Sequence, residues 1–194
     1  MAERVDLRVE LAVGRHTHDP GSVLVIAEWI DGRPRRLPRL VELLWDEDQG
    51  VACRAADVLE RITRSPSKAL KTAVARYKVE LIGLLSDATF PKVRWNLALT
   101  LPRLELTVPE CRRIAAALKT WLDDSSSIVK TAALNGLAEL TRQDSDSLPE
   151  VVDLLRLKGR SGTPAMRARS RILLNKLERG MGARREHGGL HMFD

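Results

Sequence analysis

Histidines are the first residues in this chain whose type and spacing suggest chemistry. His16 and His18 are separated by one residue, and imidazoles are common zinc ligands. No third ligand lies at a useful spacing, so we interpret the pair as part of a loop. His187 and His191 would share one face of a helix, but the two glycines between them disfavour that helix. The sequence therefore predicts no metal site.

Carboxylates and nucleophiles also give no catalytic pattern. The acidic run 46–48 falls at a turn between two expected helices, where acids cap the next helix and favour its dipole. The chain contains no Ser/His/Asp signature, no glycine-rich phosphate loop and no His-Glu-x-x-His motif. Cys53 and Cys111 have no metal or redox spacing and are expected to be buried free thiols. We predict a protein that is not an enzyme and uses no cofactor.

Composition and charge set the class of protein. The 194 residues are 44% hydrophobic, 30% charged and only 4% aromatic, and leucine and alanine are abundant, which favours helices. No apolar run reaches the length of a membrane span, and the start MAERVDLRVE lacks a secretory signal pattern, so we expect a cytoplasmic protein. Residues 156–185 carry a net charge of +9, whereas the rest of the chain carries −3.

Four segments of the sequence align as a repeat: VACRAADVLERI from Val51, VRWNLALTLPRL from Val93, VKTAALNGLAEL from Val129 and MRARSRILLNKL from Met166. Positions 1, 5, 9 and 12 of each segment are apolar, with Ser170 as the weak member. Steps of four, four and three residues place these positions on one helix face. Each segment is expected to be the second helix of a helical pair.

A shorter apolar helix precedes each of these segments, with a shared pattern of leucine, valine or tryptophan side chains. The four patterns are Leu40-Leu43-Leu44, Leu81-Leu84-Leu85, Leu118-Trp121-Leu122 and Val151-Leu154-Leu155. One long helix is expected over residues 68–86. Thr107 with Glu110, and Ser147 with Glu150, have the spacing of capping boxes. Two helices in every 36–42 residues is the size of an α-solenoid unit.

This pattern resembles the HEAT-repeat family over about residues 37–179. The resemblance implies an all-α fold: an α-solenoid, a right-handed superhelix of about four HEAT-like hairpins with an N-terminal capping segment. In that family, an Asp after each first helix and a base early in each second helix form a ladder. The matching residues here are Asp87, Asp124, Arg94, Lys130 and Arg167. Ala52 stands in the position of the first base, so the ladder is expected to end there.

The two ends of the chain differ from the repeats. Residues 1–21 are expected to be a tail, a short helix or a strand, because Val5, Leu7, Val9, Leu11 and Val13 alternate with more polar residues. A strand there would pair with another chain, as in a dimer. Residues 22–179 form the single repeat domain, and Ser22–Ile30 is a candidate cap for the first repeat. Residues 180–194 are expected to be a flexible tail.

A partner would bind the concave face, which the second helices line in the HEAT family. The candidate binding residues lie off the apolar stripe: Arg54, Asp57, Arg61, Trp95, Asn96, Leu99, Arg103, Asn135, Arg169 and Lys176. Trp95 with nearby Arg resembles an interface hot spot, but it equally fits packing against a neighbouring helix. Trp29, Trp45 and Trp121 are interpreted as core residues. Pro102 predicts a kink or early end of its helix near Leu101.

Three classes of function fit these residues. The first is a non-catalytic scaffold that binds a protein partner. The second is nucleic-acid binding through Arg167, Arg169, Arg171 and Lys176 in the basic segment. The third is an enzyme, because HEAT-like alkylpurine DNA glycosylases use an acid and aromatics, for which Asp57 and Trp95 are the available residues. HEAT-like bilin lyases are a further analogy. The absence of any catalytic motif favours the scaffold.

Overall fold

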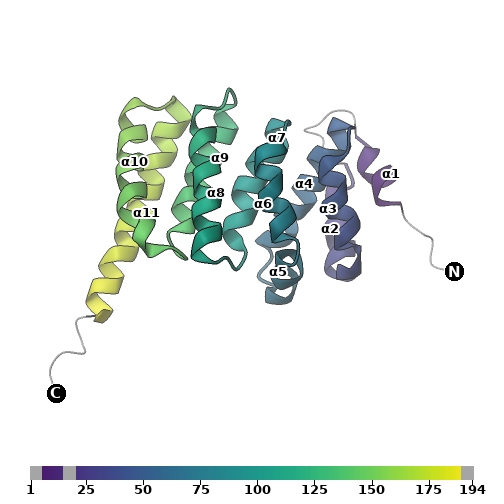
Figure 1. The fold of residues 1–194 in the computed structure, drawn as a ribbon, viewed down its shortest axis with the longest axis horizontal. Coiled ribbons are helices and arrows are strands. Elements are labelled where there is room, and N and C mark those ends of the chain that lie inside the picture. Colours follow the sequence, from purple (N-terminus) through teal and green to yellow (C-terminus); the bar gives the residue numbers. More distant parts are fainter. Residues whose placement is uncertain (1–5, 15–20, 189–194) are drawn as a thin grey trace, which may run out of the picture.

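The computed structural model describes residues 6–14 and 21–188, and its regular elements are all helices (Figure 1). The α-helices are α1 (Leu7–Ala12), α2 (Val23–Asp31), α3 (Leu37–Glu42), α4 (Gln49–Arg64), α5 (Lys68–Ala75), α6 (Lys78–Asp87), α7 (Pro91–Thr100), α8 (Val108–Thr120), α9 (Ser127–Leu140), α10 (Leu148–Ser161) and α11 (Pro164–Gly188). Short 3₁₀ helices are η1 (Pro34–Arg36), η2 (Leu43–Trp45), η3 (Leu101–Arg103), η4 (Trp121–Asp123) and η5 (Ser145–Ser147). The described residues contain no strand, so the predicted all-α class is confirmed.

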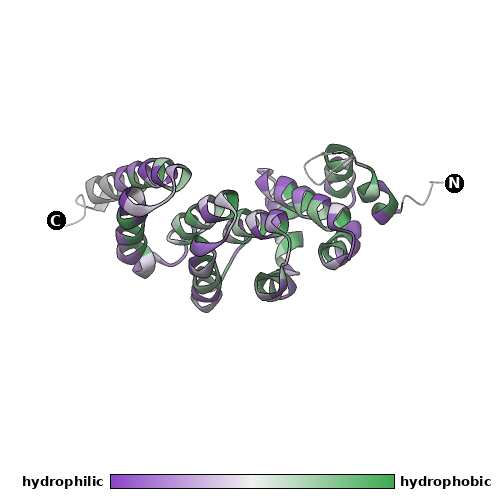
Figure 2. Cartoon of the chain, turned by 90° about the horizontal axis from the view of Figure 1, so that it is seen from above, coloured by the Kyte–Doolittle hydropathy of each residue, from purple (hydrophilic) through white to green (hydrophobic). Residues whose placement is uncertain are grey.

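The four aligned segments form successive helices of one row. α4 contacts α7, α7 contacts α9, and α9 contacts α11. The row runs along the long axis of the molecule, with the two termini at opposite ends (Figure 1). Each of these helices also contacts the helical segment just before it in the chain: η2, α6, α8 and α10 respectively. The predicted helical pairs are therefore present, and two layers of helices are visible from above (Figure 2).

The core lies between the layers and is built from the predicted stripe. All four stripe positions of α4, of the α7–η3 segment and of α9 are buried. In α11, Met166 and Ser170 are buried, whereas Leu174 and Leu177 are partly buried. The Ser170 hydroxyl is buried without a hydrogen-bond partner, and a Cβ on Gly159 of α10 would lie 3.6 Å from its Cβ. A small side chain at position 170 therefore lets α10 approach α11 closely.

Two predicted helix boundaries are confirmed and two are wrong. Thr107 and Glu110 form the predicted capping box at the start of α8. Helix α7 ends at Thr100 and continues only as η3, because Pro102 lacks the N–H that an α-helix needs. Ser147 makes no cap: it closes η5, and its hydroxyl donates to the Asp144 carbonyl instead. The single helix expected over residues 68–86 is divided at Arg76 and Tyr77 into α5 and α6.

The N-terminal segment is a helix rather than a strand in the described residues. Leu7 and Leu11 of α1 are buried, whereas Val9 and Val13 are exposed. An alternating sequence also places every fourth residue on one helix face, and that face packs on α4. Helix α2 packs on α4 as well, so both segments cover the first repeat. Met1–Val5 lie outside the described residues.

The C-terminal prediction is partly wrong. Helix α11 continues to Gly188, so it includes nine residues, 180–188, of the segment expected to be a flexible tail. Figure 1 shows its last turns extending past the end of α10. Residues 189–194 lie outside the described part of the chain.

Within the described residues, the expected ladder of acids and bases is present at one junction. Arg94 Nε lies 3.0 Å from Asp124 Oδ2. Asp87 and Lys130 take part in no ion pair among the described residues, and Arg167 donates to the Gly162 carbonyl. At the first repeat, where no base was expected, Arg8 of α1 supplies one and lies 2.7 Å from Asp46. The hydrogen bond from Arg8 lowers the pKa of Asp46.

Candidate binding groove

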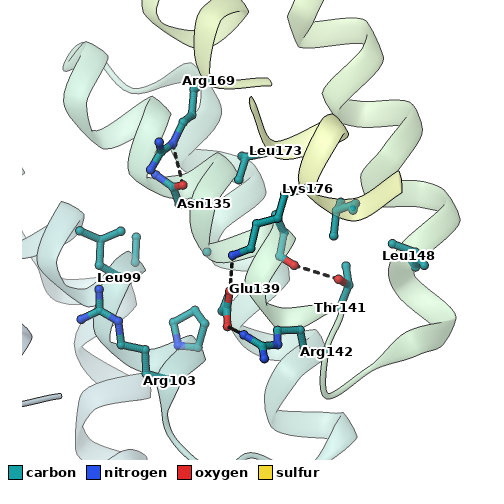
Figure 3. Close-up of a pocket in the computed structure, with 15 residues that line it drawn as sticks. Leu99, Arg103, Asn135, Glu139, Thr141, Arg142, Leu148, Arg169, Leu173 and Lys176 are labelled. Carbon is teal, nitrogen blue, oxygen red and sulfur yellow. Dashed lines mark hydrogen bonds and ion pairs between the residues drawn. The ribbon is translucent and has the colours of Figure 1, made fainter. Parts of the chain in front are cut away.

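A groove of about 720 Å³ crosses the second helices of the last three repeats (Figure 3). It is lined by Ala98, Leu99, Pro102, Arg103, Asn135, Gly136, Ala138, Glu139, Thr141, Arg142, Leu148, Arg169, Leu173, Lys176 and Leu177. The volume falls within the range of about 300–1,000 Å³ that is typical of ligand sites in proteins. These residues come from α7 with η3, from α9 and its C-terminal turn, from the start of α10 and from α11.

Apolar side chains line two sides of the groove. Leu99 and Pro102 come from the α7–η3 side, and Leu173 and Leu177 come from α11. Leu173 and Leu177 are four residues apart and therefore share one face of α11. Between these sides lies α9, where Gly136 has no side chain. Helix α9 therefore forms the floor of the groove between the two apolar sides.

Gly136 sets how closely α9 approaches α7. A Cβ at this position would lie 2.6 Å from the Ala98 carbonyl oxygen and 2.6 Å from Leu118 Cδ1. Carbon atoms in real side chains do not approach that closely, so only glycine fits. The absence of a side chain at position 136 therefore allows α9 to pack directly against α7.

Polar side chains in the groove are linked to each other. Arg169 Nε donates to Asn135 Oδ1 at 2.7 Å, and the Asn135 amide donates to the Thr131 carbonyl. Glu139 lies between two cations, with Arg142 Nη1 at 2.7 Å and Lys176 Nζ at 3.6 Å (Figure 3). The lining residues comprise four cations and one carboxylate, so the groove is positively charged.

Half of the ten predicted binding residues come together in this groove. Leu99, Arg103, Asn135, Arg169 and Lys176 all line it. Comparison with family models, curated proteins and solved structures finds no match for this chain. The groove is therefore interpreted from its own chemistry.

Arg54 does not face a partner, contrary to prediction. Only 2% of the residue is exposed. Its Nε donates to the Leu11 carbonyl and its Nη2 donates to the Ala12 carbonyl, at the C-terminal end of α1. A guanidinium at a helix C-terminus satisfies carbonyls that have no partner within the helix and favours the helix dipole. Arg54 thus holds α1 on α4.

Asp57 and Asn96 connect α4 with α7 and lie outside the groove. Lys92 Nζ lies 2.6 Å from Asp57 Oδ2, and Asn96 Nδ2 donates to Asp57 Oδ1 at 2.9 Å. Lys92 is only 8% exposed and was not among the predicted residues. Lys92 precedes the aligned segment by one residue, so the comparison of the segments did not indicate its ion pair with Asp57. The Asp57 carboxylate is committed to these two partners, which argues against a glycosylase role for it.

The Asp57–Asn96 and Asn135–Arg169 bonds follow one rule. In both, position 7 of one aligned segment binds position 4 of the next. A further link joins Arg103 to Glu60 of α4 at 2.9 Å, and Arg64 lies 2.6 Å from the same carboxylate. The polar residues predicted to bind a partner therefore also connect neighbouring helices. Arg61 is exposed and lines no part of the groove.

The tryptophans divide differently from the prediction. Trp95 is partly buried and packs against the core, which agrees with the interpretation that it contacts neighbouring helices. Trp121 is buried, as predicted. Trp45 is 45% exposed, so its assignment to the core is wrong. Trp29 is partly buried, and the Arg36 guanidinium carbon lies 5.7 Å from the centre of its ring.

The four predicted nucleic-acid contacts do not share one surface. Arg169 and Lys176 face the groove, whereas Arg167 and Arg171 are exposed and line no part of it. Among the described residues, no group of three His, Cys, Asp or Glu side chains could hold a metal ion. His16, His18 and His191 lie outside the described residues. None of the described helices combines the length and the apolar character needed to cross a bilayer.

The two cysteines are buried free thiols, as predicted. Burial raises the pKa of the Cys53 thiol to about 11 and raises that of Cys111 as well. Because the thiolate is the reactive form, both residues are expected to resist a disulfide reagent at pH 8 in the folded protein. Absorbance on addition of such a reagent should show two thiols only after denaturation. Rapid reaction of the native protein would contradict this expectation.

Proposed function

We propose that this chain is a non-catalytic scaffold: an α-solenoid of about four HEAT-like hairpins that binds a protein partner in the groove across α7, α9 and α11. The observation that carries the proposal is the groove itself, which is apolar on two sides and spans three successive repeats. A surface of this kind binds through burial of apolar area and needs no catalytic group.

The location of the groove supports binding rather than structural packing alone. Leu99 and Leu177 are only partly buried, so both retain surface that a partner can cover. Arg103, Arg142, Arg169 and Lys176 surround these apolar side chains, and a polar rim around an apolar centre is typical of protein interfaces. Catalysis would need an available acid, base or nucleophile, whereas the partly buried Asp57 carboxylate is already bonded to Lys92 and Asn96.

Leu99→Glu is expected to abolish capture of the partner, because it places a carboxylate among the apolar side chains of the groove. The measurement is a pull-down from source-cell lysate followed by cross-linking, which shows whether the captured protein touches the groove. Leu157→Glu is the matched control, because Leu157 is 57% exposed on α10 and lies outside the groove. Equal capture by both variants, with both folded by circular dichroism, would exclude the groove as the binding surface.

A further inference from the structure

We propose that the occupant of the groove is an amphipathic α-helix of the partner that presents leucine-like side chains flanked by carboxylates. This inference rests on the proposed scaffold function and names the chemistry of the partner at the same site. It is argued from the spacing of the helices that line the groove, the places of its apolar side chains and the imbalance of its charges.

The arrangement of the helices leaves room for one more helix. Packed neighbouring helices lie about 8–10 Å apart, so the axes of α7 and α11, on either side of α9, are separated by roughly twice that distance. A helix with its side chains is about 10 Å in diameter. The floor between the two walls is α9, which contributes Asn135, Ala138 and Glu139 to the lining. A helix lying over α9 would therefore contact both α7 and α11 at the same time.

Apolar side chains on both walls suit such a helix. Leu99 and Pro102 lie on one side, and Leu173 and Leu177 lie on the other. A helix with apolar residues at spacings of three and four presents one stripe about 100° wide, which contacts both walls at once. An extended peptide alternates its side chains between opposite faces and would leave half of them unburied.

The charges of the groove select a carboxylate-bearing partner. Arg169 donates to the neutral amide of Asn135, and among the described residues no carboxylate lies within ion-pair distance of its guanidinium. Lys176 and Arg142 share the single carboxylate of Glu139. The lining therefore has more cations than anions, and Glu139 occupies the position that a partner carboxylate would take beside Lys176. Guanidinium groups bind carboxylates through paired hydrogen bonds, which adds geometric selection.

The test uses two synthetic 14-residue helical peptides with identical leucine positions at i, i+3, i+4 and i+7. One carries Glu and the other carries Lys at the flanking positions, and fluorescence anisotropy measures binding to the whole chain in 0.1 M salt. The Glu peptide is expected to bind at least tenfold more tightly than the Lys peptide. Raising the salt concentration should reduce the difference, because exposed charges are screened.

Three variants locate the contact. Arg169→Gln is expected to weaken binding of the Glu peptide about twofold to fivefold, the effect of losing one exposed ion pair. Arg171→Gln is the matched control, because Arg171 is exposed on the same helix outside the groove, and it should bind like the unaltered protein. Glu139→Gln should strengthen binding by a similar factor, because it frees Lys176 and Arg142. A purely structural role of Glu139 cannot produce that gain.

Several outcomes would overturn the inference. Equal binding of both peptides, or no binding of the Glu peptide, removes the acidic helix as the occupant. Binding of a single-stranded oligonucleotide that Arg169→Gln weakens, without binding of the Glu peptide, would assign the groove to a polyanion instead. If the unaltered protein still captures a protein partner that Leu99→Glu loses, the scaffold function stands and only the class of partner is wrong. If that pull-down also fails, both proposals are wrong.

Discussion

Substituting alanine for Gly136 is expected to lower the free energy of unfolding by about 1–3 kcal/mol, the usual cost of overpacking a close contact. The added Cβ would lie 2.6 Å from the Ala98 carbonyl oxygen, which belongs to the backbone of α7. A backbone atom cannot rotate away as a side chain can. The added Cβ therefore forces α9 and α7 apart, which disturbs the packing of the row of helices. For a chain of this length each kcal/mol lowers the melting temperature by about 2–4 °C. Thermal unfolding followed by circular dichroism measures the change.

Gly83→Ala is the matched control for this substitution and should have the opposite sign. Gly83 also lies within a helix, α6, but no atom lies within 4 Å of the position where its Cβ would be. Alanine there is expected to stabilise the protein by about 0.5–1 kcal/mol through helix propensity and the unfolded-state entropy of glycine. If Gly136→Ala also raised the melting temperature, the close approach of α7 and α9 would be wrong.

Replacing Arg54 with methionine is expected to destabilise the protein by about 2–4 kcal/mol and to release α1. The side chain keeps much of its apolar volume, but the carbonyls of Leu11 and Ala12 lose the charged donor that satisfies them. Hydrogen exchange measures the local effect: amides 7–12 should lose protection, whereas those of α9 should change little. The destabilisation is large because Arg54 is buried and because its guanidinium, on α4, donates hydrogen bonds to carbonyls of α1.

The control for Arg54 is Arg61→Met on the same helix. Arg61 is exposed, and substitutions at such positions usually change stability by no more than about 0.5 kcal/mol. Equal loss of protection at α1 in both variants would show that the guanidinium of residue 54 does not hold this helix. Unchanged protection of α1 in Arg54→Met would lead to the same conclusion.

Local periodicity predicted most of the fold because each helix must bury one face. The stripe of Val51, Ala55, Leu59 and Ile62 identified α4 without any other information, and the sister stripes identified α7, α9 and α11. The same reasoning was ambiguous at α1, where residues two apart and residues four apart are both apolar. Packing against α4 decides in favour of a helix. That packing involves contacts between residues more than 40 positions apart in the sequence, which local periodicity does not show.

The groove was predicted in part because its location follows from the alignment. Residues off the stripe were expected to point into the concave face, so Leu99, Asn135 and Arg169 were found from their positions in the alignment alone. Arg54 and Asp57 have equivalent positions but different neighbours: the end of α1 in one case, and Lys92 in the other. A sequence pattern gives the direction of a side chain, whereas its partners depend on how far each helix is shifted along the next. The predicted capping box at Ser147 was wrong for a similar reason, because the 3₁₀ helix η5 already leads into α10 at this residue.

The rule that joins position 7 of one helix to position 4 of the next has a consequence for the order of the repeats. At the first junction the pair is Asp57 with Asn96, and at the third it is Asn135 with Arg169. At the middle junction both positions are apolar, Leu99 and Ala132. A repeat docked beside the wrong neighbour would leave a carboxylate or guanidinium against an apolar surface, at considerable cost. The junctions thus differ chemically from one another, which disfavours any arrangement in which the repeats exchange places.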